Sequence, residues 1–484
     1  MQWQRIFFLL FFLLLFTYTT FKYYVSDPMA AARTALGLAL ITEWNIQIDT
    51  YAHFTNDKIF RDGHFYACQA PGTSFLALPT MFLAYYTLKA MGQDDFTSFD
   101  LSHQPPKSEE RGVPSKAFGT VMLAGTFVVS FFAALGASLI YVFGIHFGTS
   151  HRVAVLVALF FGLGTPYAMW ATVLMGHALA AAFLLMSYIW GAFLIQEGFV
   201  KQATTRWLLA GFLLAFSANI EYTAAIPAII LGLTLLVSLR RTNASWSRCR
   251  CNVFLLVLGA VPAAIFFFAY NFFAFGSPLS LGYQQVTDEF PLMANGFVGV
   301  TTPKFFVLLK TLFSPRFGIL WFSPMLILFP FAVVVNLRRG FQRELNFACL
   351  LIVSYYFLLN SSYEYWFHSL NGPRHVTASL PFVFLPFLSM EQWPSPWLRR
   401  AVWILGGYSL ILFSFVLFIP LSAIYWEAYS KIPAIIAAFF RGEIRNMFYY
   451  IGLPVWASMV LPFLIWAFFG YHLWREVRRA KDGH

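Results

Sequence analysis

Residues capable of acid–base chemistry or metal binding concentrate in one polar stretch between two apolar segments, residues 26–116. The side chains of interest there are Asp27, Asp49, Asp57, Asp62 and His64. Carboxylates and imidazoles act as general bases or acids, and both also bind divalent metals. Asp57, Asp62 and His64 alternate with Lys58 and Arg61, a spacing that matches no strong metal motif, so two interpretations of these three stay open: an acid–base or metal cluster, and an exposed polar turn.

Asp27 differs from the other acids because it directly follows the first long apolar run. If that run crosses a membrane, the carboxylate lies at the membrane surface, within reach of a lipid-borne head group. Ser26-Asp27-Pro28 is also a typical helix start, since Asp caps backbone N–H groups and Pro fits the first helical position. The two roles are compatible, and the sequence supports both.

Further ionisable residues lie beside later apolar segments. His177 follows Met175-Gly176, and Glu221-Tyr222 joins two short apolar runs. An ionisable group at or near membrane depth is costly and is therefore a functional candidate. Each of these side chains can instead hydrogen-bond a neighbouring helix, so their role stays open at this point.

Cations at the ends of apolar segments form a third group: Lys304, Arg316 and Arg374, with His375 next to the last of them. Arginine is suited to bidentate phosphate recognition. The alternative is that these long side chains extend from helix ends to lipid head groups. The Gly-Pro pair before Arg374 predicts a shaped loop rather than a plain helix end.

The elements that must position these residues are membrane helices. The chain has 484 residues, of which 59% are hydrophobic and 11% charged, whereas a soluble domain has about a quarter charged residues. Apolar segments that can cross a membrane lie at 6–25, 117–145, 153–169, 173–196, 207–220, 223–239, 253–273, 317–337, 345–361, 374–391, 402–425 and 451–474. The sequence predicts an all-α polytopic membrane protein with about twelve (roughly 11–13) transmembrane helices.

Basic residues between the apolar segments predict the orientation. Arginines cluster at 240–250, at 338–343, at 399–400 and in the C-terminal tail. Such clusters stay in the cytoplasm, which accounts for the formal charge of +11 without a nucleic-acid partner. Both termini are then cytoplasmic, and the number of crossings is even. The segment 71–91 would break this parity, so we expect it to be a re-entrant or surface-lying helix on the outer side.

One membrane domain, 1–484, follows from this topology, with outer (periplasmic or lumenal) loops at 26–116, 274–316 and 427–450. We expect Met1–Phe16 to belong to an uncleaved first helix rather than to a signal peptide, because no convincing cleavage site follows. The sequence contains no nucleotide-binding motif. If the protein is an enzyme, its activated substrate therefore arrives through the membrane.

Short motifs in a fixed order point to one family. Beside Asp27 and Arg33 the chain carries Asp62-Gly63-His64-Phe65-Tyr66-Ala67-Cys68-Gln69-Ala70-Pro71-Gly72, Gly164-Thr165-Pro166, His177-Ala178, Glu221-Tyr222, Phe275-Gly276-Ser277-Pro278, Ser314-Pro315-Arg316-Phe317-Gly318 and Asn371-Gly372-Pro373-Arg374. In this order they resemble bacterial members of the GT-C superfamily of glycosyltransferases. That group includes the protein O-mannosyltransferases and the lipid A aminoarabinose transferases.

The resemblance implies a GT-C-like fold in the bacterial inner membrane. It implies transfer of a sugar, with inversion, from a polyprenyl-phosphate donor to a lipid, glycan or protein acceptor. Asp27 would be the general base, and Arg374, Arg316 and Lys304 are the candidates for binding the donor phosphate. Relatives often carry an acid and a lysine where this chain has Cys68 and Gln69. A divalent metal is therefore an open option with unknown ligands.

Two other functions stay open. One is a transporter or flippase for a lipid-linked or anionic substrate, which predicts polar residues at mid-membrane, broken helices and repeated halves. The sequence has few such residues and no internal repeat. The other is a noncatalytic protein descended from the enzymes, which the altered Cys68-Gln69 pair keeps in consideration. The sequence identifies neither the sugar nor the acceptor, and it leaves the oligomeric state open.

Overall fold

The protein is mostly α-helical in the residues that its computed structural model describes: 2–21, 27–100, 113–196, 203–242, 246–285, 290–316, 318–366, 373–419, 430–444 and 446–481. Within these residues the β-structure consists of two antiparallel pairs of short strands. Lys58–Arg61 (β1) pairs with His64–Ala67 (β2), and Phe99–Asp100 (β3) pairs with Val113–Pro114 (β4). The predicted all-α class is confirmed.

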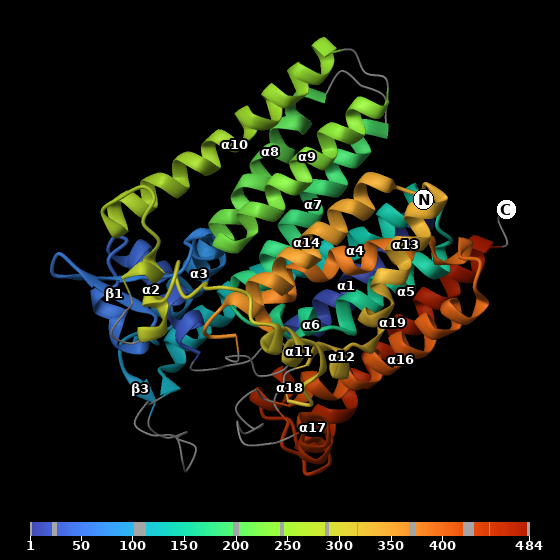
Figure 1. Cartoon of the computed structure of the whole chain (residues 1–484). Coiled ribbons are helices and arrows are strands. Elements are labelled where there is room, and N and C mark those ends of the chain that lie inside the picture. The colour runs from blue at the N-terminus through green and yellow to red at the C-terminus, as the bar shows by residue number, and fades with distance from the viewer. Residues whose placement is uncertain are drawn as a thin grey trace.

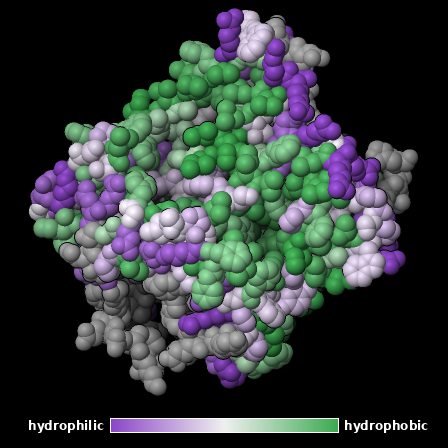
Figure 2. All heavy atoms as spheres, in the orientation of Figure 1, coloured by the Kyte–Doolittle hydropathy of each residue, from purple (hydrophilic) through white to green (hydrophobic). Residues whose placement is uncertain are grey.

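Eight helices in the described residues are long and apolar enough to cross a membrane. They are α1 (Gln2–Thr20), α4 (Lys116–His146), α7 (Gly176–Gln196), α9 (Ala225–Arg241) with its leading 3-10 turn η3 (Tyr222–Ala224), α10 (Trp246–Phe275), α14 (Arg343–Ser362), α16 (Pro396–Phe418) and α19 (Val455–Lys481). Figure 2 shows a broad hydrophobic surface between hydrophilic margins, as expected for a bundle surrounded by lipid. The prediction of a multi-pass membrane protein is thereby confirmed.

Four other predicted spans are shorter or interrupted. The segment 153–169 is divided between α5 (His151–Leu163) and α6 (Pro166–Trp170), and 207–220 belongs to α8 (Ala203–Ile220). The two segments near the C-terminal half are built from short pieces: α12 (Ile319–Phe322), η6 (Pro324–Leu328) and α13 (Phe329–Arg339), then η7 (Arg374–Ser379), α15 (Leu380–Phe384) and η8 (Leu385–Gln392). Proline starts many of these pieces, because it lacks an N–H group and cannot continue a preceding helix.

The first polar stretch folds into a compact layer at one end of the bundle. It contains α2 (Pro28–Thr42), η1 (Asp49–Phe54), the β1–β2 pair and α3 (Gly72–Ala90). Gly72 lies against the Asn219 carbonyl at the end of α8, and the hydroxyl of Ser115 before α4 donates to the Asp95 carbonyl at 2.6 Å. Helix α3 thus runs from the end of α8 back to the start of α4. Its expected location at a membrane surface stays a prediction.

The two ends of the chain meet at the opposite end of the bundle (Figure 1). The amide of Gln2 donates to the Glu476 carbonyl at 3.2 Å, and the Trp466 indole donates to the Thr17 hydroxyl at 2.9 Å. These contacts make α1 and α19 antiparallel neighbours. An even number of crossings follows if each end of the bundle faces one side of a membrane.

The outer loops after α10 contribute the remaining elements near the polar layer. They are η4 (Gly282–Gln284), η5 (Pro291–Ala294) and α11 (Phe305–Phe313), and the later helices α17 (Lys431–Phe440) and α18 (Met447–Tyr450) lie before α19. The Arg61 guanidinium rests on Gly276, which has a left-handed φ of 81° and follows directly on α10. This contact holds the β1–β2 pair against the end of that helix.

Candidate functional site

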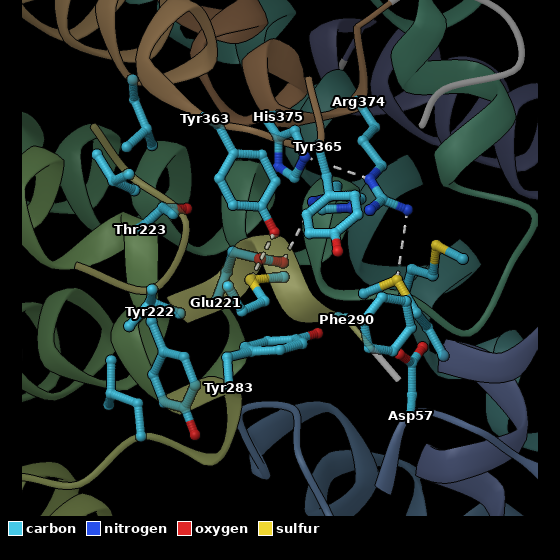
Figure 3. Close-up of a pocket in the computed structure, with 18 of the residues that line it drawn as sticks. Asp57, Glu221, Tyr222, Thr223, Tyr283, Phe290, Tyr363, Tyr365, Arg374 and His375 are labelled. Carbon is cyan, nitrogen blue, oxygen red and sulfur yellow. Dashed lines mark hydrogen bonds and ion pairs between the residues drawn. The ribbon is translucent and has the colours of Figure 1, made fainter. Parts of the chain in front are cut away.

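A cavity of about 710 Å³ lies where the polar layer meets the helix ends. Its walls come from the start of α2, the start of α7, the α8–η3 junction, the loop after α10, the end of α14 and η7. Seven of the sequence candidates line it: Asp27, Asp57, His177, Glu221, Tyr222, Arg374 and His375. Figure 3 shows several of these side chains around the open space.

Asp27 is the cap of helix α2 that its place before Pro28 predicted. It caps α2, because its Oδ1 accepts hydrogen bonds from the backbone N–H groups of Met29 at 2.8 Å and Ala30 at 3.2 Å. It also lines the cavity. Its Oδ2 receives no hydrogen bond from any residue that the structure describes, so this oxygen is the one available to a substrate.

Asp57 is the second carboxylate of the cavity, and only 5% of the residue is exposed. Thr55 links it to the segment that holds Asp27. The Thr55 hydroxyl donates to the Pro28 carbonyl at 2.7 Å and accepts from the Asp57 N–H at 3.0 Å. The two acids therefore stand on adjoining, mutually bonded segments of the first outer loop.

Glu221 and His177 form a pair at another wall, with Oε2 and Nδ1 3.2 Å apart. Gly176 makes the approach possible, since a Cβ there would lie 2.6 Å from that same carboxylate oxygen. The carboxylate thus stands at the N-terminus of α7, where the helix dipole favours negative charge. Burial raises the pKa of Glu221, but His177, Arg33 and Arg374 outweigh it and bring the pKa below its ordinary value.

Arg374 is the cavity's cation, held between two neighbours. Its Nε lies 3.4 Å from Nε2 of His375, and its Nη1 lies 3.5 Å from the Met29 sulfur. The His375 ring packs edge-on against Tyr363, with ring centres 4.7 Å apart. In Figure 3 Arg374 and His375 lie on the side of the open space opposite Asp57. An anion in the cavity would have the guanidinium within reach and a carboxylate facing it.

The rest of the cavity wall is largely apolar and aromatic. It is formed by Met29, Trp170, Ile226, Leu281, Tyr283, Phe290, Phe297, Tyr355, Leu359, Tyr363 and Tyr365, among others. Ile226, at the start of α9, is 47% exposed, and Ile229 and Leu233 follow it on the same helix face, 62% and 58% exposed. The apolar wall therefore continues along the exposed face of α9, which an apolar chain leaving the cavity can follow.

Of the two interpretations of Asp57, Asp62 and His64, the exposed polar turn describes Asp62 and His64, and Asp57 lies apart from them in the cavity lining. Asp62 stands on the β1–β2 turn, largely exposed and paired with Arg61 at 2.9 Å. His64 pairs with Asp49 at 2.7 Å on the surface. The strands place these side chains away from the cavity lining to which Asp57 belongs.

Two predicted phosphate ligands also lie outside the set of residues lining the cavity. Lys304 pairs with Glu364 at 2.8 Å, and this hydrogen bond holds the pKa of Glu364 below its ordinary value. Arg316 lies near Lys431, and burial together with this neighbouring charge lowers the pKa of the lysine to about 8. Of the three predicted cations, Arg374 alone appears among the described lining residues.

Arg33 lies buried behind the cavity, 2% exposed, and its Nη1 donates to the Met29 carbonyl at 3.1 Å. Cys68 and Gln69 are buried in the same layer. Burial raises the pKa of the Cys68 thiol, so it stays neutral. Neither polar atom of the Gln69 amide has a hydrogen-bond partner among the described residues.

A metal does not fit the residues at hand. No group of three His, Cys, Asp or Glu side chains in the described part of the chain could hold an ion.

Four tyrosines of the cavity were not among the sequence candidates: Tyr283, Tyr355, Tyr363 and Tyr365. Tyr355 lies on α14, and the other three lie in the segments that follow α10 and α14. Aromatic residues are common in and beside the helices of membrane proteins, so the sequence offered no signal that separated these four from the others.

Comparison with known proteins leaves the family open. No family model matches the chain, and no curated protein matches it in a sequence search. The GT-C resemblance therefore rests on the ordered motifs alone.

Proposed function

We propose that the protein is a glycosyltransferase that moves a sugar from a polyprenyl-phosphate donor to a lipid, glycan or protein acceptor. The observation that carries this proposal is one cavity that brings together Asp27, Arg374 and an apolar wall continuing along the exposed face of α9. A lipid-borne phosphate ester needs all three: a base for the acceptor, a cation for the phosphate and apolar contacts for the prenyl chain.

The reaction is a single displacement at the anomeric carbon. The free oxygen of Asp27 removes the proton from an acceptor hydroxyl, and the resulting oxygen nucleophile attacks the sugar from the face opposite the phosphate. The new glycosidic bond forms as the bond from carbon to phosphate oxygen breaks, and its electron pair leaves with the polyprenyl phosphate. One displacement inverts the configuration of that carbon.

Arg374 stabilises the charge that gathers on the departing phosphate. A guanidinium offers paired N–H donors that match two phosphate oxygens, and fixed donors aimed at developing charge lower the barrier. Met29 and His375 hold the guanidinium in place at the wall of the cavity.

The membrane arrangement that completes the proposal has about twelve crossings and a GT-C-like fold. Both termini lie in the cytoplasm of a bacterial cell, and the polar layer lies outside the inner membrane. In this arrangement the four shorter or interrupted segments, 153–169, 207–220, 317–337 and 374–391, also cross the membrane, although none of them forms a long apolar helix. Donor and acceptor meet on the non-cytoplasmic face.

The Asp27→Asn variant tests this proposal in proteoliposomes that contain a polyprenyl-phosphate sugar and extracts of cell-surface acceptors. We expect sugar transfer to fall by about a hundredfold or more, as loss of a general base costs roughly 10²–10⁴ in rate. The matched control is Asp62→Asn, the same change on the exposed turn, which keeps full activity. Full transfer by Asp27→Asn would remove the base assignment. Absence of any transfer by the wild-type protein would reject the proposed reaction.

A further inference from the structure

A second, smaller cavity of about 310 Å³ lies at the end of the bundle away from the polar layer. It is formed where the start of α5, the end of η8 and the first turns of α16 meet. Its polar lining residues are Ser150, Arg152, Glu391 and Arg399, and its apolar ones are Val153, Met390 and Trp403. The proposed sugar transfer uses none of them.

The two arginines of this cavity differ in how they are held. The Arg152 guanidinium lies over the Trp403 ring, 5.5 Å from its centre, a contact that orients the cation without cancelling its charge. No carboxylate pairs with Arg152 among the described residues. Arg399 donates to the Glu391 backbone carbonyl at 3.1 Å, which also leaves its charge in place.

Glu391 is the one acid of the lining, and it is already engaged. Its two carboxylate oxygens accept from the hydroxyl of Ser150 at 2.6 Å and from the Ser150 N–H at 3.2 Å. This places the carboxylate at the N-terminus of α5, where its charge is partly balanced by the helix dipole. Two cations against one engaged acid leave the cavity with a net positive charge.

Apolar side chains continue from this cavity along both helices. On α5, Leu156 and Leu159 follow Arg152 by four and seven residues on the same helix face and are half-buried. On α16, Leu410 follows Trp403 by seven residues on the same helix face and is half-buried. Gly406 lets the helices approach closely, because a Cβ there would lie 2.6 Å from the Phe160 ring. The seam is the apolar surface where α5 and α16 meet. A positively charged cavity next to this seam matches the anionic head group and the acyl chains of a phospholipid.

We propose that this cavity binds the head group of an anionic phospholipid, with its acyl chains along the seam between α5 and α16. The phosphate lies between Arg152 and Arg399, and the Trp403 ring packs against the glycerol region, where indoles are common. A zwitterionic lipid should bind more weakly, because the positive group of its own head is repelled by the two arginines. This inference does not depend on the proposed sugar transfer.

The test is lipid binding to the full-length protein in mixed micelles, followed by native mass spectrometry and by the thermal unfolding midpoint. Phosphatidylglycerol should bind and raise the midpoint, and phosphatidylcholine should do so far less. Arg152→Gln should weaken phosphatidylglycerol binding about fivefold, the effect expected of one basic residue at a membrane surface. Arg152→Lys keeps the charge and should retain most of the binding.

The matched control is Arg478→Gln, because Arg478 is also exposed and stacked on a tryptophan, Trp474, at 3.9 Å but lies outside the cavity lining. It should bind phosphatidylglycerol like the wild-type protein. Equal binding of the two lipids, equal weakening by the Arg478 change, or full displacement of the lipid by millimolar inorganic phosphate would each overturn the proposal. Unaltered binding by both Arg152→Gln and Trp403→Leu would do the same.

Discussion

At the scale of single residues, the neighbours of a cation decide whether it can serve a ligand. Lys304 and Arg374 carry the same charge and stand at similar places in the sequence, next to a proline at the edge of an apolar segment. Lys304 is paired with Glu364 at 2.8 Å, whereas Arg374 lines the cavity beside Met29 and His375. The carboxylate of Glu364 would compete with a substrate for Lys304, whereas Arg374 stands in the cavity where the proposed donor phosphate would bind.

Arg374→Ala should therefore weaken the binding of a polyprenyl-phosphate sugar by about 10- to 100-fold, the loss expected for hydrogen bonds to a charged group. Acceptor binding should change much less. Donor affinity can be measured by titration in nanodiscs, with Lys304→Ala as the control of equal charge change. Equal donor affinity in the wild-type and Arg374→Ala proteins would take Arg374 out of the phosphate role.

Glu221 gives a second prediction at this scale. Its carboxylate pairs with His177 and also lies beside the N-terminus of α7. Glu221→Gln keeps the shape and removes the charge. We expect the unfolding free energy to fall by about 1–2 kcal/mol, the upper range for a charge at a helix terminus. Thermal unfolding in detergent measures this, and Asp49→Asn on the exposed surface pair serves as the control. An unchanged midpoint for Glu221→Gln would mean that the carboxylate contributes no stability there.

The sequence separated the acids of the first outer loop only in part. Asp27 was identifiable by its position after an apolar run and by its capping motif. In the structure it caps α2 and lines the cavity. Asp62 followed by Gly63 is a hairpin-turn signature, and the structure has Asp62 at a left-handed φ of 52° on that turn. That signal could have removed it from the acid cluster. Asp57 enters the cavity through Thr55 and its bond to the Pro28 carbonyl, a tertiary contact that spacing does not encode.

At the scale of elements, close helix approach depends on small residues. A Cβ on Gly211 of α8 would lie 1.9 Å from the Leu256 carbonyl oxygen, and one on Gly259 of α10 would lie 2.0 Å from that of Leu208. The two glycines face each other's helices and let the backbones nearly touch, as small residues do in membrane bundles. This contact fixes α8 beside α10 and thereby the position of the Glu221 junction that follows α8.

Gly259→Ala should separate the two helices and destabilise the protein by about 1–3 kcal/mol, the usual cost of overpacking. Gly407→Ala on α16 is the matched control, because no atom lies within 4 Å of a Cβ at that position. The control should be neutral or stabilised by up to about 1 kcal/mol, since alanine favours a helix. Both are measured by thermal unfolding in the same detergent. A Gly259→Ala protein as stable as the control would show that the helices part without cost.

Element boundaries were predictable where apolar runs are long and contain at most one proline. The run at 117–145 has none and forms one helix, α4, and the run at 253–273 forms one helix, α10, with Pro262 inside it. The run at 374–391 does not form one helix, because Pro381 and Pro386 lie five residues apart and each stands at the start of a new short piece, α15 and η8. Hydropathy alone predicts one span for such a run, whereas each proline removes a backbone N–H group and weakens the helix at that point.

At the scale of the whole molecule, the cavity exists because segments far apart in the sequence converge on one end of the bundle. Asp27 and Arg374 are brought together by the contact of the Arg374 guanidinium with the Met29 sulfur. Charge patterning predicted that both residues lie on the same side of a membrane, and the shared cavity is in keeping with this. Charge patterning could not predict that Lys304 and Arg316 lie outside the cavity lining, because the packing of the loops decides which residues surround them.

The orientation of the whole bundle can be tested with a cysteine that the chain already has. Of its four cysteines, Cys251 is exposed and Cys68, Cys249 and Cys349 are buried. Cys251 directly follows the basic residues Arg248 and Arg250 near the start of α10, so the positive-inside rule predicts that it lies in the cytoplasm. A membrane-impermeant maleimide added to intact cells should leave Cys251 unlabelled, and the same reagent should label it in permeabilised cells.

The complementary variant is Asp62→Cys in a Cys251→Ser background. The side chain of Asp62 is 74% exposed in the polar layer, so a cysteine at that position should be labelled in intact cells. Labelling of Cys251 in intact cells, or protection of the cysteine at position 62 from the reagent, would show that the protein has the opposite orientation in the membrane. The cavity would then face the cytoplasm, where a donor and acceptor of the outer surface cannot meet in it.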